Sequence, residues 1–508
     1  MEDYHKLALE TLNLSKQAII FNPSRASAEK TAEDIAKLLS ENLPELEEGI
    51  IKAASTPTKQ CKRLAACVRK GIAFHHAGLL QGQKDLVEEN FKNGKIKIIC
   101  ATPTLAAGLS LPVFRVIIKS LKRFSGRWGM DWIPVLEYLQ MAGRAGRPEY
   151  EKLGEAICLA KNEAEKDEIH SRYILGQPEE IYSKLAVEPV LRTYLLSLIS
   201  SGIIRDEKSM QGFFSKTFWA AQFKDMAKLG DIMERMLSLL EEWGFVQITG
   251  EEKGDFVIAS SIGNHERILR ATPLGRRISE LYLDPLTARH LLTCLAKFNS
   301  EHTAFSLLQI ISHTLEMRPL LSVKRKEEEE IYGELNQRYQ QLLDPEPSAF
   351  DPEYGDFLDS VKTALFFSSW IEENNEDFLL DKFGITPGVI RYKLEAADWL
   401  LYACEELSKV MLYREAVKDI VKLRLRVKQG VKEELLPLMK LKGIGRIRAR
   451  KLHSNGVKDL GDFNKIDPTS LAQLLGKTLA LDVKKQIGEE VHEVSKGKRK
   501  GQLSLEKF

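Results

Sequence analysis

The chain has few of the features that mark secreted, membrane-bound or metal-stapled proteins. Among its 508 residues are only six cysteines, and no two of them form a C-x-x-C pair, so neither a disulfide framework nor a zinc site of that kind is expected. The longest apolar runs, such as residues 113–118, are too short to cross a bilayer. The polar, acidic first residues hold no secretory signal. These absences predict a reduced, cytoplasmic protein of roughly three to four domains.

An excess of one charge and a phosphate-binding loop are also missing. The net charge is only +2, so any surface that attracts nucleic acid must be local. The sequence G-x-x-x-x-G-K-[ST], whose backbone amides cradle nucleotide phosphates, occurs nowhere. The letters Asp167-Glu168-Ile169-His170 imitate the acidic box that holds magnesium in nucleotide hydrolases. They lie in a charged helical stretch and not at the end of an apolar strand, so we interpret the match as a coincidence.

Short apolar runs alternate with amphipathic segments through the first third of the chain. Helices are expected over residues 1–15, from Ser24 or Ser27 to Leu39, and over 84–91. The apolar runs predict buried strands, at residues 17–21, 72–74, 97–100, 116–118 and 156–159. Strands that alternate with helices form a right-handed parallel α/β sheet. Ligands of such sheets bind beyond the carboxyl ends of the strands.

Two of the loops expected at that edge carry polar residues. The loop at 75–79 begins with His75 and His76. Neighbouring side chains of an extended segment point opposite ways, so we expect no metal site there. The loop at 101–112 offers Thr102 and backbone amides, which suit phosphate oxygens of a nucleotide or of DNA. Its alternative interpretation is a capped helix start.

The third loop, Gln140–Pro148, is the most specific. Arg144 and Arg147 each follow a glycine directly after an apolar run. Arginine never loses its charge and donates two parallel hydrogen bonds, which suits phosphate. Glycine lets the backbone approach a ligand closely. A surface turn with two solvated arginines is the alternative.

The three loops together identify a family. Residues 75–79, 101–108 and 140–148 have the order and spacing of motifs IVa, V and VI of superfamily-2 helicases, and residues 1–490 resemble the archaeal Holliday-junction-migrating (Hjm-type) DNA repair helicases. The resemblance implies that residues 1–178 form the second RecA-like domain. Serine stands at 110, where the family usually has asparagine.

The resemblance also implies a shared ATP site. Arg144 and Arg147 would be catalytic arginine fingers, and Gln140 and Gly108 would also contact the nucleotide. The cofactors would be ATP and Mg²⁺, with the Mg²⁺ ligands in a domain that this sequence does not contain. We therefore expect an N-terminal helicase half on another chain as a partner.

Between motifs V and VI lies a basic stretch, residues 119–130, punctuated by glycine. In the family this region holds the β-hairpin that separates the duplex. Phe124 and Trp128 are aromatic residues able to stack on a base. The alternative is a basic surface hairpin.

The middle of the chain is mostly helical. Helices over 181–201 and 231–243, followed by a hairpin of strands 245–249 and 255–259, suggest a winged helix over 179–280, which the family uses as an articulation. Residues 281–430 are expected to form an all-α ratchet bundle. Its informative helix runs from Pro387 to Leu407, and Arg391 and Trp399 lie on one face of it. There they would hold single-stranded DNA, unless Trp399 belongs to the core.

Residues 431–492 resemble a helix-hairpin-helix domain. Its glycines, Gly443 and Gly445, would leave backbone amides open to a DNA phosphate. The basic side chains around them form a local cluster, whose members are Lys442, Arg446, Arg448, Arg450 and Lys451. The alternative is a basic amphipathic helix for an acidic partner.

The tail, residues 493–508, is basic. Gln502, Leu505 and Phe508 fall three apart, as in peptides that dock on the sliding clamp.

The sequence thus predicts an α/β RecA-like parallel-sheet domain followed by winged-helix, ratchet and helix-hairpin-helix domains. The expected function is the C-terminal part of an ATP-dependent 3′–5′ DNA helicase of repair and fork restart, bound to single-stranded and forked DNA in the nucleoid. The alternative is a non-catalytic DNA-binding accessory protein that kept the fold.

Overall fold

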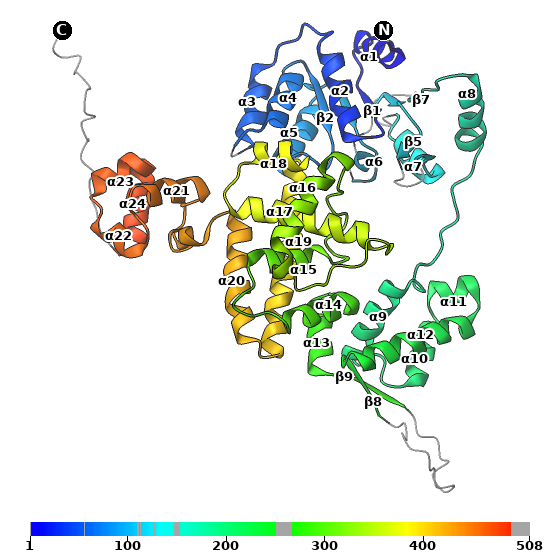
Figure 1. Ribbon diagram of the computed structural model, residues 1–508. Coiled ribbons are helices and arrows are strands. Elements are labelled where there is room, and N and C mark those ends of the chain that lie inside the picture. Colours follow the sequence, from blue (N-terminus) through cyan, green and yellow to red (C-terminus); the bar gives the residue numbers. More distant parts are fainter. Residues whose placement is uncertain are drawn as a thin grey trace, which may run out of the picture. The chain divides into compact units, whose positions relative to one another are not determined.

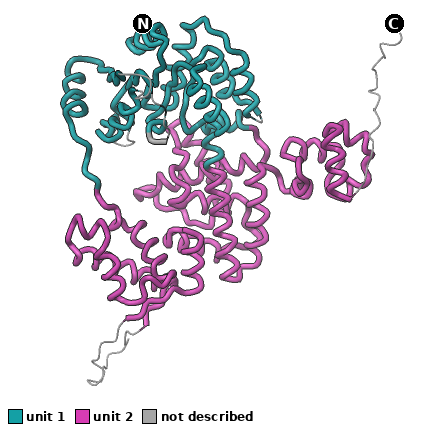
Figure 2. Tube along the Cα trace, turned by 180° about the vertical axis from the view of Figure 1, so that it is seen from behind, with its two compact units in different colours: residues 1–181, 376–392 teal, residues 182–375, 393–508 magenta. Residues whose placement is uncertain are grey.

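The structure is a computed structural model that describes residues 2–54, 56–108, 111, 113–124, 129–146, 153–249 and 267–488. The chain forms two compact units (Figure 2). Unit 1 combines Met1–Ile181 with the distant segment Glu376–Tyr392, and unit 2 holds Tyr182–Asn375 and Lys393–Phe508. The five predicted segments divide the chain more finely than this, and their boundaries stay predictions.

Unit 1 is built on a five-stranded sheet in the order β2-β3-β1-β4-β7 (Figure 1). Every neighbouring pair is parallel. The strands are β1 (Ala18–Phe21), β2 (Ile72–His75), β3 (Ile98–Ala101), β4 (Arg115–Ile118) and β7 (Glu155–Cys158). All five strands predicted from apolar runs are confirmed, and each predicted end lies within one residue of the observed end. The first four are completely buried, as strands covered on both faces must be.

Helices connect and cover these strands. They are α1 (Asp3–Asn13), α2 (Arg25–Ala36), α3 (Pro44–Lys52), α4 (Lys59–Val68), α5 (Gln81–Lys92), α6 (Thr104–Gly108), α7 (Val135–Ala142) and α8 (Glu163–Ile169), which continues as a π-helix (His170–Ile174). Of the two expected caps, Ser24 is the one used, because its side chain accepts from Ser27 N–H. The predicted extension of α2 to Leu39 is wrong. The acidic-box letters at 167–170 lie where α8 meets the π-helix, as expected of a coincidence.

A separate two-stranded hairpin lies between motifs V and VI. Its strands are β5 (Lys122–Phe124) and β6 (Met130–Trp132), paired antiparallel with Phe124 opposite Met130. The expected hairpin is therefore present. Trp128 lies outside the described residues.

The first part of unit 2 contains α9 (Glu188–Ser200), α10 (Glu207–Phe214), α11 (Phe218–Phe223), α12 (Met226–Glu242), β8 (Val246–Thr249), β9 (Ile268–Ala271) and α13 (Pro273–Glu280). One expectation was wrong here, and a second one is not tested. Helix α9 begins at Glu188, not at Ile181, because Pro189 suits a first turn. Strand β8 pairs with β9, whereas the expected partner, residues 255–259, lies outside the described residues. The winged-helix interpretation stays a prediction.

The helical part that follows comprises α14 (Pro285–Leu295), α15 (Ala304–Ser312), α16 (Glu328–Arg338), α17 (Tyr354–Ile371), α18 (Glu376–Phe383), α19 (Pro387–Val410) and α20 (Arg414–Gln429). Helix α17 is buried along most of its length. The long helix expected from Pro387 is confirmed as α19. Helix α18 and the first turns of α19 belong to unit 1.

The last described residues form a small helical region. Short 3₁₀ turns (Glu433–Leu435 and Leu438–Lys440) precede α21 (Arg446–Ser454), α22 (Leu460–Lys465), α23 (Pro468–Leu475) and α24 (Lys477–Gln486). Its core is separate from that of the sheet and includes Val431, Phe463 and Val483. Within the described ranges, no helix is long and apolar enough to span a membrane.

Candidate functional site

The carboxyl ends of the strands form one level edge in unit 1. In the register, Phe21 lies beside Ala101 and Ile118, and Ala101 lies beside His75. The loops that carry motifs IVa and V therefore start side by side. Thr102 N–H donates to the carbonyl of His75 across 3.3 Å, so Thr102 lies at the edge where a ligand of a parallel sheet is expected.

The two histidines of motif IVa brace that loop from opposite sides. His75 Nε2 lies 2.9 Å from Glu88 of α5, and His76 Nε2 lies 3.1 Å from Glu29 of α2. Gly78 N–H donates to His76 Nδ1 across 3.1 Å, so the Nε2 atom of His76 carries the proton that Glu29 accepts. Each histidine thus contacts a different carboxylate and fixes the course of residues 76–78.

The start of α19 is seated on the same loop. Gly388 N–H donates to the carbonyl of Gly78 across 3.0 Å. A Cβ atom at Gly388 would lie only 2.4 Å from the Ala77 carbonyl oxygen and 2.5 Å from that of Leu79. Sequence reasoning missed this contact. A glycine in the first turn of a predicted helix was its only signal.

Helix α18 adds a second attachment to unit 1. Lys59 begins α4, and its backbone N–H donates to Asp377 across 2.9 Å while its Nζ contacts Asp381 across 2.7 Å. Residues 376–392 are therefore held to the sheet domain at two places, through α4 and through motif IVa. This segment appears with unit 1 in Figure 2.

Motif VI is joined by its backbone to the residues just before β4. Val113 N–H donates to the Arg144 carbonyl across 2.9 Å, and Gly146 N–H donates to the Val113 carbonyl across 2.6 Å. Gly146 has a φ of +96°, which favours glycine. Gly154 packs against it so closely that a Cβ atom there would lie 2.2 Å from the Gly146 nitrogen. The glycines of motif VI thus permit a backbone-to-backbone contact.

Arg144 links motif VI to motif V through its side chain. Its Nη2 donates to the Ala106 carbonyl in α6 across 2.5 Å. Its Nε is buried and has no hydrogen-bond partner among the described residues. A buried donor without an acceptor costs about 1–3 kcal/mol, so this atom suits an anionic ligand.

The other residues expected at the nucleotide are distributed around Arg144. Gln140 is exposed on α7, and Gly108 ends α6. Arg147 lies outside the described residues. Among the described residues of this set, the buried Nε of Arg144 is the feature that fits a phosphate.

The hairpin carries an exposed apolar pair. Phe124 is 71% exposed and Met130, opposite it, is 58% exposed. The base of the hairpin is held more firmly, because Lys122 Nζ lies 4.1 Å from the centre of the Trp132 ring and Arg123 contacts Glu137 through two hydrogen bonds. The exposed apolar pair on this anchored hairpin is suited to stack on a base of DNA.

Arg391 and Trp399 of α19 differ in burial. Arg391 is exposed. Trp399 is half-buried, and its indole N–H donates to the Leu281 carbonyl across 3.0 Å. Part of the tryptophan ring therefore belongs to the helical core, while the rest is accessible.

Two arginines of the C-terminal cluster are bound to protein groups. Arg446 donates to the carbonyls of Glu373 and Asn374 across 2.7 and 2.6 Å, and its guanidinium lies 5.0 Å from the centre of the Trp370 ring. Arg450 forms ion pairs with both Glu373 and Glu434. These contacts fasten α21 to the end of α17.

The rest of the cluster faces outward. Lys442 and Arg448 are exposed, and Arg448 donates to the Gly443 carbonyl across 2.8 Å. Gly443 has a φ of +85°, and Gly445 is the N-cap of α21. Lys451 donates to the Leu474 carbonyl. The structure thus divides a cluster that looks uniform in the sequence.

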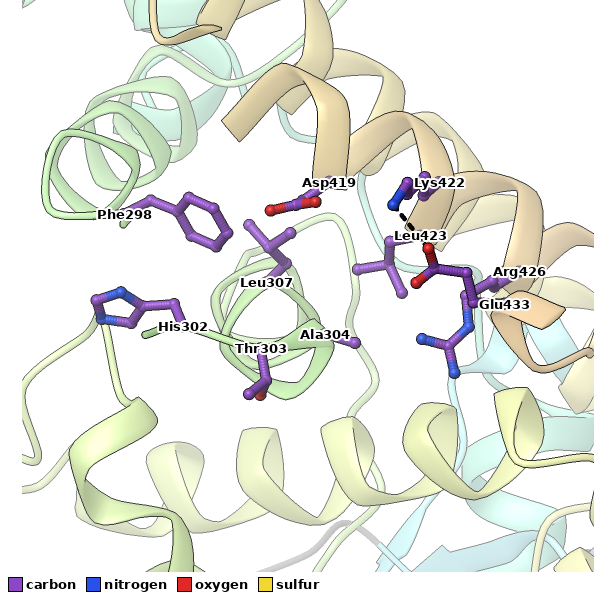
Figure 3. Close-up of a pocket in the computed structure, with 10 residues that line it drawn as sticks. All are labelled: Phe298, His302, Thr303, Ala304, Leu307, Asp419, Lys422, Leu423, Arg426 and Glu433. Atoms are coloured by element: carbon purple, nitrogen blue, oxygen red, sulfur yellow. Dashed lines mark hydrogen bonds and ion pairs between the residues drawn. The ribbon is translucent and has the colours of Figure 1, made fainter. Parts of the chain in front are cut away.

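A shallow pocket between α15 and α20 lies outside all of these predicted residues (Figure 3). Its cations are paired, since Lys422 contacts Glu433 across 2.6 Å and Arg426 contacts Glu372 across 3.2 Å. Neither of these two cations therefore offers an unpaired positive charge to a phosphate.

Comparison with known proteins agrees with this geometry. Residues 3–149 match the family model of the helicase conserved C-terminal domain, and residues 305–430 match that of domain 4 of archaeal helicases. The class of the protein is thus a helicase fold, with a RecA-like sheet domain and an archaeal helical domain.

The relatives narrow the class. The chain is 36% identical to the ATP-dependent DNA helicase Hel308 of Pyrococcus horikoshii over 514 residues, which cover 98% of this chain and 68% of the relative. The Pyrococcus abyssi protein of the same name gives the same figures. That of Methanocella arvoryzae is 36% identical over 96% of this chain and 65% of its own length. The chain therefore belongs to the Hel308 family of archaeal helicases, and it spans about two thirds of the length of these relatives.

Proposed function

We propose that this chain supplies the arginine side of the ATP site and most of the DNA path of an ATP-dependent 3′–5′ DNA helicase that acts in repair and fork restart. The observation that carries the proposal is Arg144. Its side chain joins motif VI to motif V, and its buried Nε has no acceptor among the described residues.

At the nucleotide, Arg144 and Arg147 donate to oxygens of the γ-phosphate, as arginine fingers do. Gln140 and Gly108 also contact the nucleotide. ATP with Mg²⁺ would supply the phosphoryl transfer that drives movement. The 508 residues hold no G-x-x-x-x-G-K-[ST] loop, so the lysine and the Mg²⁺ ligands lie outside them, and these residues alone hydrolyse little ATP.

On the DNA, we assign contacts to the residues that the resemblance points to. Thr102 lies at the sheet edge, Phe124 and Trp128 belong to the hairpin region, and Arg391 and Trp399 lie on α19. Lys442, Arg448 and the amides near Gly443 and Gly445 hold phosphates. Arg446 and Arg450 support this surface from behind through Glu373. We keep the C-terminal peptide of Gln502, Leu505 and Phe508 as a sliding-clamp ligand.

The contact between Gly388 and motif IVa connects ATP binding with DNA binding. Any shift of residues 76–79 moves the start of α19, because backbone contacts leave no space between them. A movement of motif IVa is thereby transmitted to α19, the helix that holds DNA.

The experiment that tests the proposal is reconstitution. The 508-residue chain is mixed with a polypeptide that carries a phosphate-binding loop and an acidic box, and DNA-stimulated ATP hydrolysis is measured. We expect hydrolysis from the mixture that is lost with Arg147→Ala and kept with the control Arg235→Ala, an exposed arginine paired with Glu188. No hydrolysis from the mixture, with DNA binding intact, would favour a non-catalytic DNA-binding accessory protein.

The connection through Gly388 has its own test. Gly388→Ala places a methyl group against two carbonyl oxygens. We therefore expect the reconstituted mixture to unwind DNA more slowly, at nearly unchanged DNA affinity. The control is Gly333→Ala in α16, where a Cβ atom meets nothing within 4 Å. Equal unwinding rates for the two variants would contradict the connection.

A further inference from the structure

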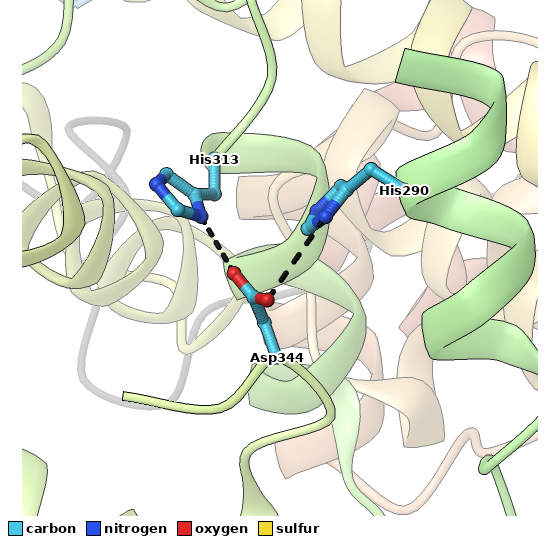
Figure 4. Close-up of side chains that lie close together, drawn as sticks. All are labelled: His290, His313 and Asp344. Carbon is cyan, nitrogen blue, oxygen red and sulfur yellow. Dashed lines mark hydrogen bonds and ion pairs between the residues drawn. The ribbon is translucent and has the colours of Figure 1, made fainter. Parts of the chain in front are cut away.

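Two histidines and an aspartate converge in unit 2, away from every residue assigned above (Figure 4). His290 lies on α14, His313 follows the last residue of α15, and Asp344 lies in the loop after a 3₁₀ turn (Tyr339–Gln341). One nitrogen or oxygen of each side chain lies within 4.8 Å of the other two. All three side chains are half-buried, so water can still reach them.

The orientation of His290 matches that of a metal ligand. Its Nε2 lies 3.3 Å from the Ile310 carbonyl oxygen, which can only accept, so Nε2 carries the proton. Its Nδ1 therefore turns a lone pair toward Asp344 Oδ1, 4.0 Å away. Two electron-rich atoms that face each other are stable when a cation lies between them. Metal-binding histidines usually donate their other N–H to a carbonyl or carboxylate in this way.

Lys297 donates to the carbonyl of Leu343, the residue before Asp344. It brings one opposing positive charge close to the site.

We propose that His290, His313 and Asp344 bind one divalent transition-metal ion of the Zn²⁺ type, with water as the fourth ligand. Two imidazoles select Zn²⁺, Co²⁺ or Ni²⁺ over Mg²⁺ and Ca²⁺, which prefer oxygen. The ion replaces the proton between His313 Nδ1 and Asp344 Oδ2, which are now 2.6 Å apart. With bonds of about 2.1 Å, ligand atoms on a tetrahedral ion lie roughly 3.4 Å apart. The present distances of 2.6 and 4.0 Å lie on either side of that value.

The bound ion would fasten the loop around Asp344 to α14 and α15. These helices belong to the part of the chain that matches the archaeal helical domain or directly precedes it. The role is therefore structural, and it is independent of ATP or DNA.

The test uses the full chain, stripped with a chelator and then desalted. Calorimetric titration with Zn²⁺ is expected to give one site per chain, and Co²⁺ is expected to give the visible absorption of a tetrahedral complex. His290→Gln and the nearly isosteric Asp344→Asn should each weaken binding about tenfold or more. The control His302→Gln changes a half-buried histidine between α14 and α15 that is not part of the cluster, and it should leave binding unchanged.

Thermal unfolding separates loss of the site from loss of the fold. Zn²⁺ is expected to raise the Tm of the wild type and of His302→Gln, but not that of Asp344→Asn, whose far-UV spectrum should stay native. Wild-type affinity retained in both His290→Gln and Asp344→Asn would overturn the proposal, and so would a wild type that binds no Zn²⁺. The three side chains would then form a hydrogen-bonded network only.

Discussion

Motif VI and the glycine turn before α21 both place arginines next to glycines, yet the structure uses them differently. Arg144 has one carbonyl partner and a buried Nε without an acceptor among the described residues. Arg446 and Arg450 have carbonyls, carboxylates and an aromatic ring around them. The first arrangement is incomplete without a ligand, whereas the second is complete within the protein. Arginine density in a sequence therefore indicates a site only after its internal partners are known.

The substitution with the largest expected effect is Arg144→Ala. If Arg144 acts on the γ-phosphate, its loss lowers kcat for DNA-stimulated ATP hydrolysis about 10³-fold in the reconstituted enzyme. The Tm should change little, because one carbonyl contact is lost. A large fall in Tm with kcat preserved at low temperature would instead make Arg144 a structural link between motifs V and VI.

Lys393 provides the extreme case of a cation satisfied by protein alone. It is 1% exposed, and it donates to the carbonyls of Met317 and Pro319. Burial lowers its pKa to about 8 from 10.5. Between these values the unfolded chain binds the extra proton, so stability should rise from pH 8 to pH 10.5, by up to about 3 kcal/mol. Below pH 8 both states are protonated and this dependence vanishes.

Denaturant titrations at several pH values measure this effect. The quantity to follow is the difference between the wild type and Lys393→Met, because other groups that titrate in this range cancel in it. A difference that stays flat across pH 8 to 10.5 would show that Lys393 keeps its ordinary pKa.

Arg446→Ala should act on stability more than on DNA. It removes two hydrogen bonds from a charged donor and the contact with Trp370, so the free energy of unfolding should fall by about 2 kcal/mol. DNA affinity of the folded protein should fall less than in Arg448→Ala. The reverse order would return Arg446 to the DNA surface, where the sequence had assigned it.

The contrast between predictable and unpredictable parts follows from the distance over which each signal acts. The strands of unit 1 were predicted because burial on both faces leaves a continuous apolar run that can be read locally. The predicted start of α9 was wrong, because it depends on Pro189, and the pairing of β8 with β9 was missed, because the two strands are distant in the sequence.

Side-chain partners were the hardest to predict. Arg450 contacts Glu373, 77 residues earlier in the chain, and His76 contacts Glu29, 47 residues earlier. Nothing in the local pattern marks such pairs. The same holds for residues 376–392, which the sequence grouped with the helical bundle but which pack with unit 1. Motif spacing predicted where a ligand binds, while the contacts of each arginine required the fold.

The smallest expected effect is that of Arg448→Ala, two residues from Arg446. Its guanidinium is exposed beside the Gly443 turn, so removing one phosphate contact should weaken DNA binding by about 1 kcal/mol and leave the Tm unchanged. The slope of log affinity against log salt should fall in magnitude by about 0.7, the value for one phosphate of single-stranded DNA. Fluorescence anisotropy with single-stranded DNA at four salt concentrations measures both quantities. A slope equal to that of the wild type would mean that Arg448 does not contact DNA, and that the outward half of the cluster depends on Lys442 and the backbone amides alone.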